Sequence, residues 1–162
     1  AHDLLTAATW ESASVKDVLR STLAAHDSGD DRIVIDGVDM LLGPKQALSL
    51  ALTVHELATN AAKYGALSND EGMVHIHWSN TGLDALDNRQ FQFVWREAGG
   101  PTVREPERKG FGTKLISRVL AADFSGSVSI DYAPAGVVCT LTAPVESVGT
   151  GAQPPVKTEE AL

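Results

Sequence analysis

One stretch, residues 44–65 (PKQALSLALTVHELATNAAKYG), constrains what this chain can fold into more than any other. Pro44 suits the first turn of a helix, and Gly65 suits the left-handed residue that closes one. Most residues between them are apolar, and a helix that is apolar on nearly all sides is normally buried. The stretch therefore predicts a long helix in the core of the fold.

Three polar residues interrupt this helix at regular spacing. Glu56, Asn60 and Lys63 are separated by four and three positions, which places them on one stripe, and Tyr64 follows at the helix end. Polar groups on an apolar helix are costly unless they are satisfied. One interpretation is a salt-bridged edge that faces water. The other is a concave polar site in which Asn60 offers an oxygen to a hard cation and Lys63 meets an anion.

A second anomaly lies at the end of a predicted strand over residues 91–97. The alternation that points Phe91, Phe93 and Trp95 in one direction also points Glu97 that way. A carboxylate at the end of an aromatic, core-facing row would be available to a ligand. The alternative is that the strand has already ended and Glu97 faces solvent.

Residues 98–112 (AGGPTVREPERKGFG) form a loop rich in glycine and charge ahead of a predicted helix. Glycines at a helix start let backbone N–H groups approach an anion, and the helix dipole favours negative charge there. The loop is therefore able to close over phosphates. The residues that suit this role are Gly99, Gly100, Arg108, Lys109, Gly110 and Gly112.

The rest of the pattern predicts one mixed sheet with its helices on one face, an α/β (α+β) two-layer sandwich. Ser14 and Asp17 resemble a capping box for a helix that ends near His26, and Asp36-Gly37 suggests a hairpin. The remaining expected elements are strands at 32–36, 38–42, 73–78, 128–132 and 137–143, and a helix at 113–123 that packs through Leu115, Ile116, Val119 and Leu120. A polar loop is expected at 79–90.

Composition narrows the class of protein. The 162 residues carry a net charge of −8, which argues against nucleic-acid or anionic-membrane binding because both need a basic face. A single cysteine, Cys139, excludes a disulfide framework and fits a reducing compartment. No apolar run reaches the roughly 20 residues that cross a membrane. A cytoplasmic domain, or one cut from a longer protein, is expected.

Two possible metal sites each lack a ligand that the site would need. His55-Glu56 resembles the start of a zinc-protease motif, but Thr59 stands where the second histidine is needed. His75 and His77 lie on one strand face without an evident third ligand.

The motifs together resemble the catalytic, ATP-binding domain of histidine kinases with the GHKL (Bergerat) fold, and most closely the HWE subfamily. Residues 55–68 (HELATNAAKYGALS) resemble the N box, and Trp95-Arg96-Glu97 matches the W-x-E of that group. Residues 97–101 resemble the first glycine box and 110–116 (GFGTKLI) the second. The resemblance implies a catalytic domain over 11–144 and the end of a dimerisation-hairpin helix over 1–10. Residues 145–162 are rich in Pro, Gly, Glu and Thr without periodicity, which predicts a disordered tail.

The resemblance also implies roles for individual residues. Asn60 would coordinate the magnesium that bridges the ATP phosphates, and Glu56 would be the acid–base or water-positioning carboxylate. Glu97 would stand in place of the aspartate that bonds the adenine amino group. Lys63 would contact phosphate. The other implied nucleotide contacts are Tyr64, Gly99, Gly100, Arg108, Lys109, Gly110, Gly112 and the late-strand hydroxyl of Thr140. The role of His55 stays open.

The function implied is binding of Mg-ATP and transfer of its γ-phosphoryl group to a histidine. The H-R-x-x-N signature of the phosphoacceptor helix is absent, so the acceptor would lie on a helical hairpin of the same or a neighbouring kinase chain. A response regulator receiver domain would take the phosphate next. The lid between the glycine boxes, 102–109, is short, so large lid movements are not expected. The alternatives are a GHKL-type ATPase and a non-catalytic module that binds nucleotide, or no nucleotide, to regulate a partner.

Overall fold

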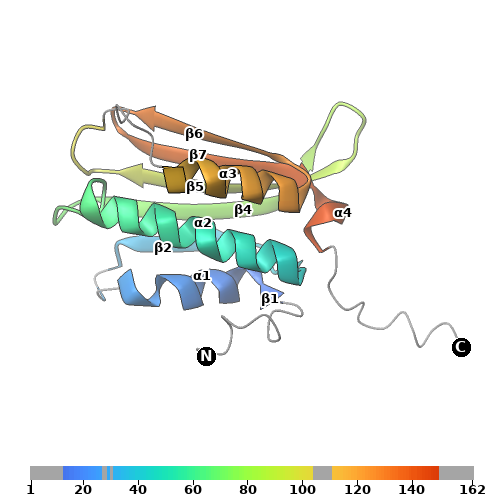
Figure 1. The fold of residues 1–162 in the computed structure, drawn as a ribbon, viewed down its shortest axis with the longest axis horizontal. Helices are drawn as coiled ribbons and strands as arrows, with labels where there is room; N and C mark the ends of the chain where they lie inside the picture. Colours follow the sequence, from blue (N-terminus) through green and yellow to red (C-terminus); the bar gives the residue numbers. More distant parts are fainter. Residues whose placement is uncertain (1–12, 27–28, 30, 104–110, 150–162) are drawn as a thin grey trace, which may run out of the picture.

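The computed structural model describes residues 13–26, 29, 31–103 and 111–149. Five strands form a mixed sheet in the order β2-β4-β5-β7-β6, in which β2 and β4 are parallel and the other neighbours are antiparallel. The helices cover one face of this sheet (Figure 1). The expected two-layer α+β architecture is confirmed. The strands are β2 (Ile33–Gly37), β4 (Met73–Leu83), β5 (Arg89–Ala98), β6 (Ser127–Ala133) and β7 (Gly136–Pro144), and the helices are α1 (Val15–Leu23), α2 (Pro44–Lys63) and α3 (Phe111–Phe124), with a 3₁₀ turn at Ala24–His26.

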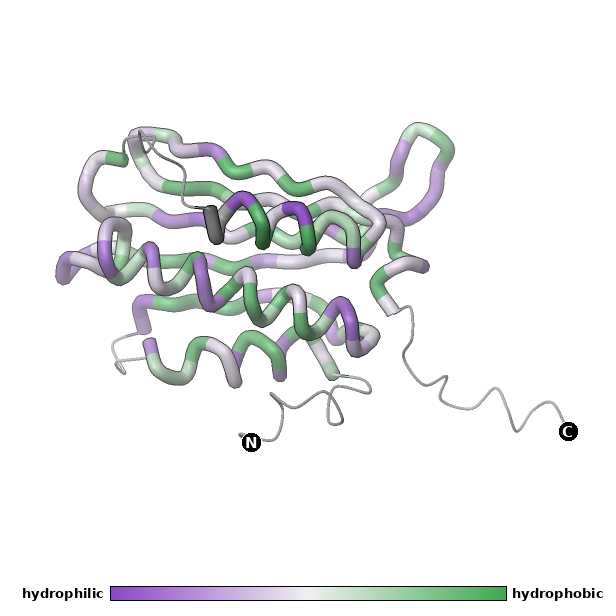
Figure 2. The backbone as a smooth tube through the Cα atoms, in the orientation of Figure 1, coloured by the Kyte–Doolittle hydropathy of each residue, from purple (hydrophilic) through white to green (hydrophobic). Residues whose placement is uncertain are grey.

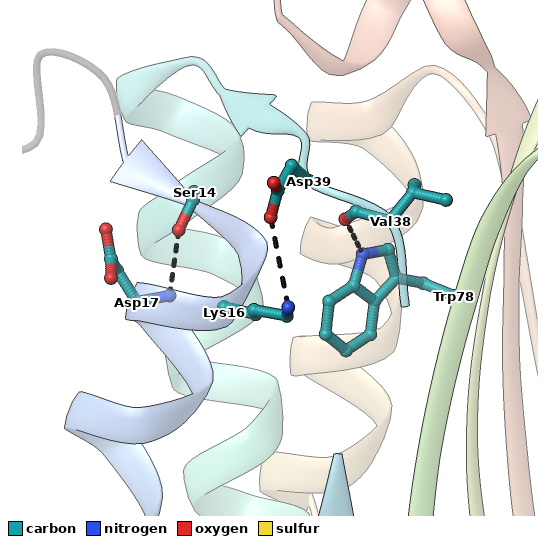
Figure 3. A network of polar contacts seen from close by, with 6 residues as sticks. All are labelled: Ser14, Lys16, Asp17, Val38, Asp39 and Trp78. Carbon is teal, nitrogen blue, oxygen red and sulfur yellow. Dashed lines mark hydrogen bonds and ion pairs between the residues drawn. The ribbon is translucent and has the colours of Figure 1, made fainter. Parts of the chain in front are cut away.

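The hairpin expected around Asp36-Gly37 is wrong. β2 pairs in parallel with β4, and a separate two-stranded sheet joins β1 (Ala13–Ser14) to β3 (Leu41–Leu42). Neither residue of the pair has the positive φ that the tight hairpin turn requires. Instead, a Cβ at Gly37 would lie 2.2 Å from the Trp78 ring, and Trp78 Nε1 donates to Val38 O at 2.7 Å (Figure 3). Contact with Trp78 thus directs the chain out of the sheet at this point.

The predicted cap at the start of α1 is confirmed. Asp17 N donates to Ser14 Oγ at 3.0 Å, which satisfies one of the first N–H groups of the helix (Figure 3). Lys16 Nζ and Asp39 Oδ1 lie 3.9 Å apart beside it, and this exposed ion pair contributes little to stability.

The core lies between the sheet and the helical layer. Alternate residues of β4 and β5 point toward the helices, as the sequence predicts, and apolar residues of α2 pack on them. The buried side chains of this layer include Val74, Ile76, Trp78, Phe91, Phe93, Trp95, Leu50, Val54 and Leu57. On the next strand, Cys139 is 2% exposed and also belongs to the core.

Burial of α2 on all sides is wrong. Leu48 and Leu52 are 43% and 48% exposed, because α2 lies in a single layer of helices whose outer face has no covering element among the described residues. Hydrophobic and hydrophilic residues follow one another along the helix (Figure 2). Gly65 is also not left-handed: α2 ends at Lys63, and Tyr64 is the C-cap residue.

The helix α3 shows the same pattern. It begins at Phe111, two residues earlier than expected, and Leu120 is buried as predicted. Leu115 and Val119 were expected to pack with it, but they are 48% and 38% exposed. The periodicity identified the helix correctly and overestimated the width of its buried face.

The loop expected at 79–90 is shorter than predicted. β4 runs to Leu83 with an irregularity between Ser79 and Gly82, and β5 begins at Arg89. In the remaining turn, Asp84 Oδ1 accepts hydrogen bonds from Leu86 N at 2.8 Å and Asn88 N at 2.9 Å. These bonds lower the pKa of the Asp84 carboxyl group.

The disordered tail does not begin at residue 145. α4 (Val145–Val148) packs on the domain: Val148 is fully buried, and its carbonyl oxygen accepts from Gly43 N at 3.1 Å. Gln46 Nε2 donates to Ser147 O at 3.1 Å as well. The rest of the expected tail and the expected helix end at 1–10 lie outside the described residues. Within the described part of the chain, no helix is long and apolar enough to cross a membrane.

We predict that Cys139 makes stability depend on alkaline pH. Burial raises the pKa of its thiol from 9.0 to about 12, so the folded state holds a proton that the unfolded chain releases above about pH 9. The free energy of unfolding should therefore fall between pH 9 and 12, by up to about 1.4 kcal/mol per pH unit. Urea unfolding of the wild type and Cys139→Ala at pH 8 and 10 measures this. A pH-independent difference between the two proteins would contradict it.

Candidate functional site

Glu97 occupies the end of β5 with its side chain turned toward the helical layer. It is 5% exposed, as the alternation of the strand predicts, and the solvent-facing alternative is excluded. Its Oε2 accepts from Trp95 Nε1 at 3.0 Å, and its Oε1 accepts from Ala66 N at 3.0 Å. The carboxylate thus connects β5 to the turn that follows α2.

Glycines allow this turn to approach the carboxylate. A Cβ at Gly65 would lie 2.3 Å from Glu97 Oε1, and a Cβ at Gly100 would lie 2.6 Å from Ala66 Cα. Gly65 is therefore required for close approach, not for the left-handed backbone that its position after a helix suggests. The N-box turn and the first glycine box are in direct contact.

Asn69 makes a further connection between these two segments. Its Oδ1 accepts from Glu71 N at 3.1 Å and Gly72 N at 2.8 Å, and its Nδ2 donates to Gly99 O at 3.2 Å. Gly99 has a φ of +79°, a conformation that favours glycine. The first glycine box is thus fixed to the turn by a side-chain amide.

The polar stripe of α2 faces partly into the domain. Asn60 Nδ2 donates to Glu56 Oε2 at 3.2 Å, and both side chains are half-buried. This bond leaves the Asn60 carboxamide oxygen as an acceptor for a cation. Lys63 and Tyr64 are exposed at the helix end, Tyr64 by 73%, and His55 is exposed as well.

Thr140 does not join the other candidates. In the register of β5 and β7, Thr140 pairs with Val94, whereas Trp95 pairs with Cys139. Side chains of paired residues share a face, so Thr140 lies on the sheet face opposite Trp95 and Glu97. The prediction that its hydroxyl reaches the same pocket as Glu97 is therefore wrong, because Thr140 is one position out of phase with the β7 residues that face the Glu97 side.

The phosphate end of the expected site is only partly described. Gly112 lies in the first turn of α3. Arg108, Lys109 and Gly110 lie outside the described residues. Among the residues that the structure describes, no group of three or more His, Cys, Asp or Glu side chains is placed to hold a metal ion.

Sequence reasoning missed Arg32. Its Nε donates to Gly72 O at 2.8 Å, and its Nη2 donates to Ala66 O at 2.9 Å and Asn69 O at 2.5 Å. These acceptors lie 34 to 40 positions away along the chain, so no local pattern marks the residue.

The fold is that of histidine kinase catalytic domains. The structure resembles the histidine kinase domain of the Erythrobacter litoralis EL346 blue-light activated histidine kinase, with a TM-score of 0.62 and 14% identity over 85% of this chain and 66% of that one. It also resembles the catalytic domain of histidine kinase ThkA, with a TM-score of 0.60 and 12% identity over 84% of this chain and 97% of that one.

Sequence relatives point to the same class. The chain is 34% identical over 146 residues to a blue-light-activated histidine kinase of Brucella ovis, and 37% identical to that of Brucella anthropi; each match covers 90% of this chain and 29% of the relative. No protein-family model matches. These relatives and the fold together support a sensor histidine kinase catalytic domain. The chain spans about three tenths of the length of these relatives.

We predict that Glu97→Gln destabilises the fold by about 1–3 kcal/mol. The carboxamide of the variant has only one oxygen for the two buried donors, Trp95 Nε1 and Ala66 N. Its NH₂ group would face the second of these donors, so that N–H group loses its acceptor. Urea unfolding measures the loss. Glu71→Gln, at an exposed side chain of the same turn, is the control and should leave stability unchanged. Equal stability of Glu97→Gln and the wild type would contradict the role of the carboxylate.

Proposed function

We propose that this chain is the ATP-binding catalytic domain of an HWE-type histidine kinase, which binds Mg-ATP and presents its γ-phosphoryl group to a histidine. The observation that carries the proposal is the buried Glu97 carboxylate, which is joined through Ala66 to the end of the helix that holds Glu56 and Asn60. An adenine acceptor and a cation ligand are thus held by one connected framework.

The adenine end is assigned to Glu97. Each carboxylate oxygen has two acceptor positions, and Trp95 Nε1 and Ala66 N use one on each oxygen. A further position remains for the exocyclic amino group of adenine. Gly99 and Gly100 would let the base approach the backbone, and the exposed Tyr64 ring would pack near the nucleotide.

The phosphate end is assigned to the stripe of α2 and the second glycine box. Mg²⁺ typically keeps several waters and takes one or two protein oxygens besides substrate phosphates. The Asn60 carboxamide oxygen beside the Glu56 carboxylate supplies donors of this kind. Lys63 would contact phosphate. The remaining phosphate contacts would come from Arg108, Lys109, Gly110 and Gly112.

Catalysis would consist mainly of positioning and charge neutralisation, as in other phosphoryl transfers. Magnesium would offset phosphate charge, and Glu56 would orient the attacking group or accept its proton. The acceptor would be a histidine on a dimerisation hairpin of the same or a neighbouring kinase chain. A response regulator would receive the phosphate next; ThkA, a structural neighbour, has been observed in complex with the response regulator TrrA. A domain that uses ATP in this way would act in the cytoplasm.

We predict that a non-hydrolysable ATP analogue binds the wild type at micromolar concentration and at least about tenfold more tightly with Mg²⁺, a gain of about 1.4 kcal/mol. Asn60→Ala should lose this gain and keep the magnesium-free affinity, because only the cation ligand is removed. Calorimetric titration with and without Mg²⁺ measures both. Asn80→Ala is the control, because Asn80 lies in the hairpin between β4 and β5, which is at the end of the domain opposite to the C-terminal end of α2 that carries Asn60 (Figure 1).

Three results would count against the proposal. An unchanged magnesium effect in Asn60→Ala would remove the metal assignment, and no binding by the wild type at millimolar nucleotide would favour the non-catalytic module. Steady release of phosphate from ATP by the wild type would favour the GHKL-type ATPase.

A further inference from the structure

We propose that Arg32 is a positioning residue of the nucleotide site and sets the adenine end of the pocket without touching the ligand. The inference rests on the proposed function, because it assigns Arg32 to the framework that holds Glu97. Arg32 lies immediately before β2, in a different part of the sequence from the N box and the first glycine box.

Arg32 holds the turn after α2 by donating hydrogen bonds to the backbone carbonyl groups of that turn. The guanidinium donates to the carbonyl oxygens of Ala66, Asn69 and Gly72 at 2.9, 2.5 and 2.8 Å. Hydrogen bonds from a charged donor are stronger than neutral ones, and the planar fork of arginine reaches several acceptors at once. The backbone of Arg32 is itself fixed, because Val74 N donates to Arg32 O at 2.8 Å.

The same turn is held from the other side by the candidate site. Ala66 is hydrogen-bonded on both sides: its carbonyl oxygen accepts from Arg32, and its N–H donates to Glu97 Oε1. Asn69 repeats the arrangement, since its carbonyl accepts from Arg32 and its side chain donates to Gly99 O. Arg32 therefore acts on both groups assigned to adenine, Glu97 and the first glycine box, through one intervening residue each.

Close packing makes the turn unable to absorb a shift. A Cβ at Gly72 would lie 1.9 Å from Ala66 O, and one at Gly100 would lie 2.6 Å from Ala66 Cα. A shift of Ala66 would therefore reach Gly100 through packing and the Glu97 carboxylate through the Ala66 N–H bond. The described hydrogen bonds of the Arg32 guanidinium go to this turn and not to Glu56 or Asn60, so the magnesium end should be unaffected.

The test uses Arg32→Lys and Arg32→Met. Lysine keeps the charge but lacks the fork, and methionine removes both. Arg89→Met is the matched control, because Arg89 is exposed and donates to a single carbonyl, Asn80 O at 3.1 Å. Two measurements are made on each folded protein: calorimetric affinity for adenosine and for the ATP analogue with and without Mg²⁺, and amide hydrogen exchange without any nucleotide.

In each Arg32 variant, we expect the affinities for adenosine and for the ATP analogue to fall by the same factor. The loss of charge-assisted hydrogen bonds implies a factor on the order of tenfold. The magnesium effect should keep its size, which a general loss of structure or a phosphate role would not produce. Exchange should rise in residues 65–72 and also at 99–100, to which the described hydrogen bonds of the Arg32 guanidinium do not extend. Arg89→Met should match the wild type.

A folded Arg32→Met with wild-type affinity and exchange would overturn the inference, as would a loss confined to the magnesium-dependent part of binding. If Arg32→Met does not fold, Arg32→Lys decides by the same criteria. Absence of nucleotide binding by the wild type would overturn the proposed function instead. Exchange at 99–100 would then still show whether Arg32 controls the glycine box.

Discussion

The buried carboxylate of Glu97 is the interaction on which the rest of the site depends. A carboxylate that is 5% exposed is costly to bury, and two donors, Trp95 Nε1 and Ala66 N, offset that cost. One donor belongs to β5 itself and the other to the turn after α2. Satisfying the charge therefore requires the helix end and the strand end to meet, and the nucleotide contacts proposed here are placed around that meeting point.

This requirement explains where glycine is needed. Gly136 begins β7, and a Cβ there would lie 1.7 Å from Glu97 O, whereas a Cβ at Gly65 would meet Glu97 Oε1. The strand neighbour and the helix turn both approach Glu97 more closely than any side chain would permit. Gly65 thus makes room for the carboxylate of Glu97 and Gly136 for its backbone carbonyl, whereas Gly99 supplies a left-handed backbone conformation.

The sequence predicts what is local and periodic. Alternation placed Glu97 inward, and spacing aligned Glu56 with Asn60, because both depend on residues a few positions apart. The prediction of a hairpin at Asp36-Gly37 was wrong, because the local turn signal competed with parallel pairing of β2 to β4, about 40 positions away. Thr140 failed because the motif fixes a residue near the site but not which of two strand faces it occupies. Arg32 could not be found at all, since its partners follow only from the folded chain.

On the proposed assignment, Glu97 stands where the resemblance implies an aspartate, and its contacts give a reason why a glutamate suits that place. Its longer side chain reaches back to Trp95 on its own strand and across to Ala66. Two fixed donors orient the carboxylate before a ligand arrives, and a positioned acceptor costs less to organise on binding than a mobile one. A third donor such as an adenine amino group would then bind to a charge already held in place. On this argument Trp95 contributes to nucleotide affinity through Glu97, which gives the paired W-x-E residues one shared physical reason.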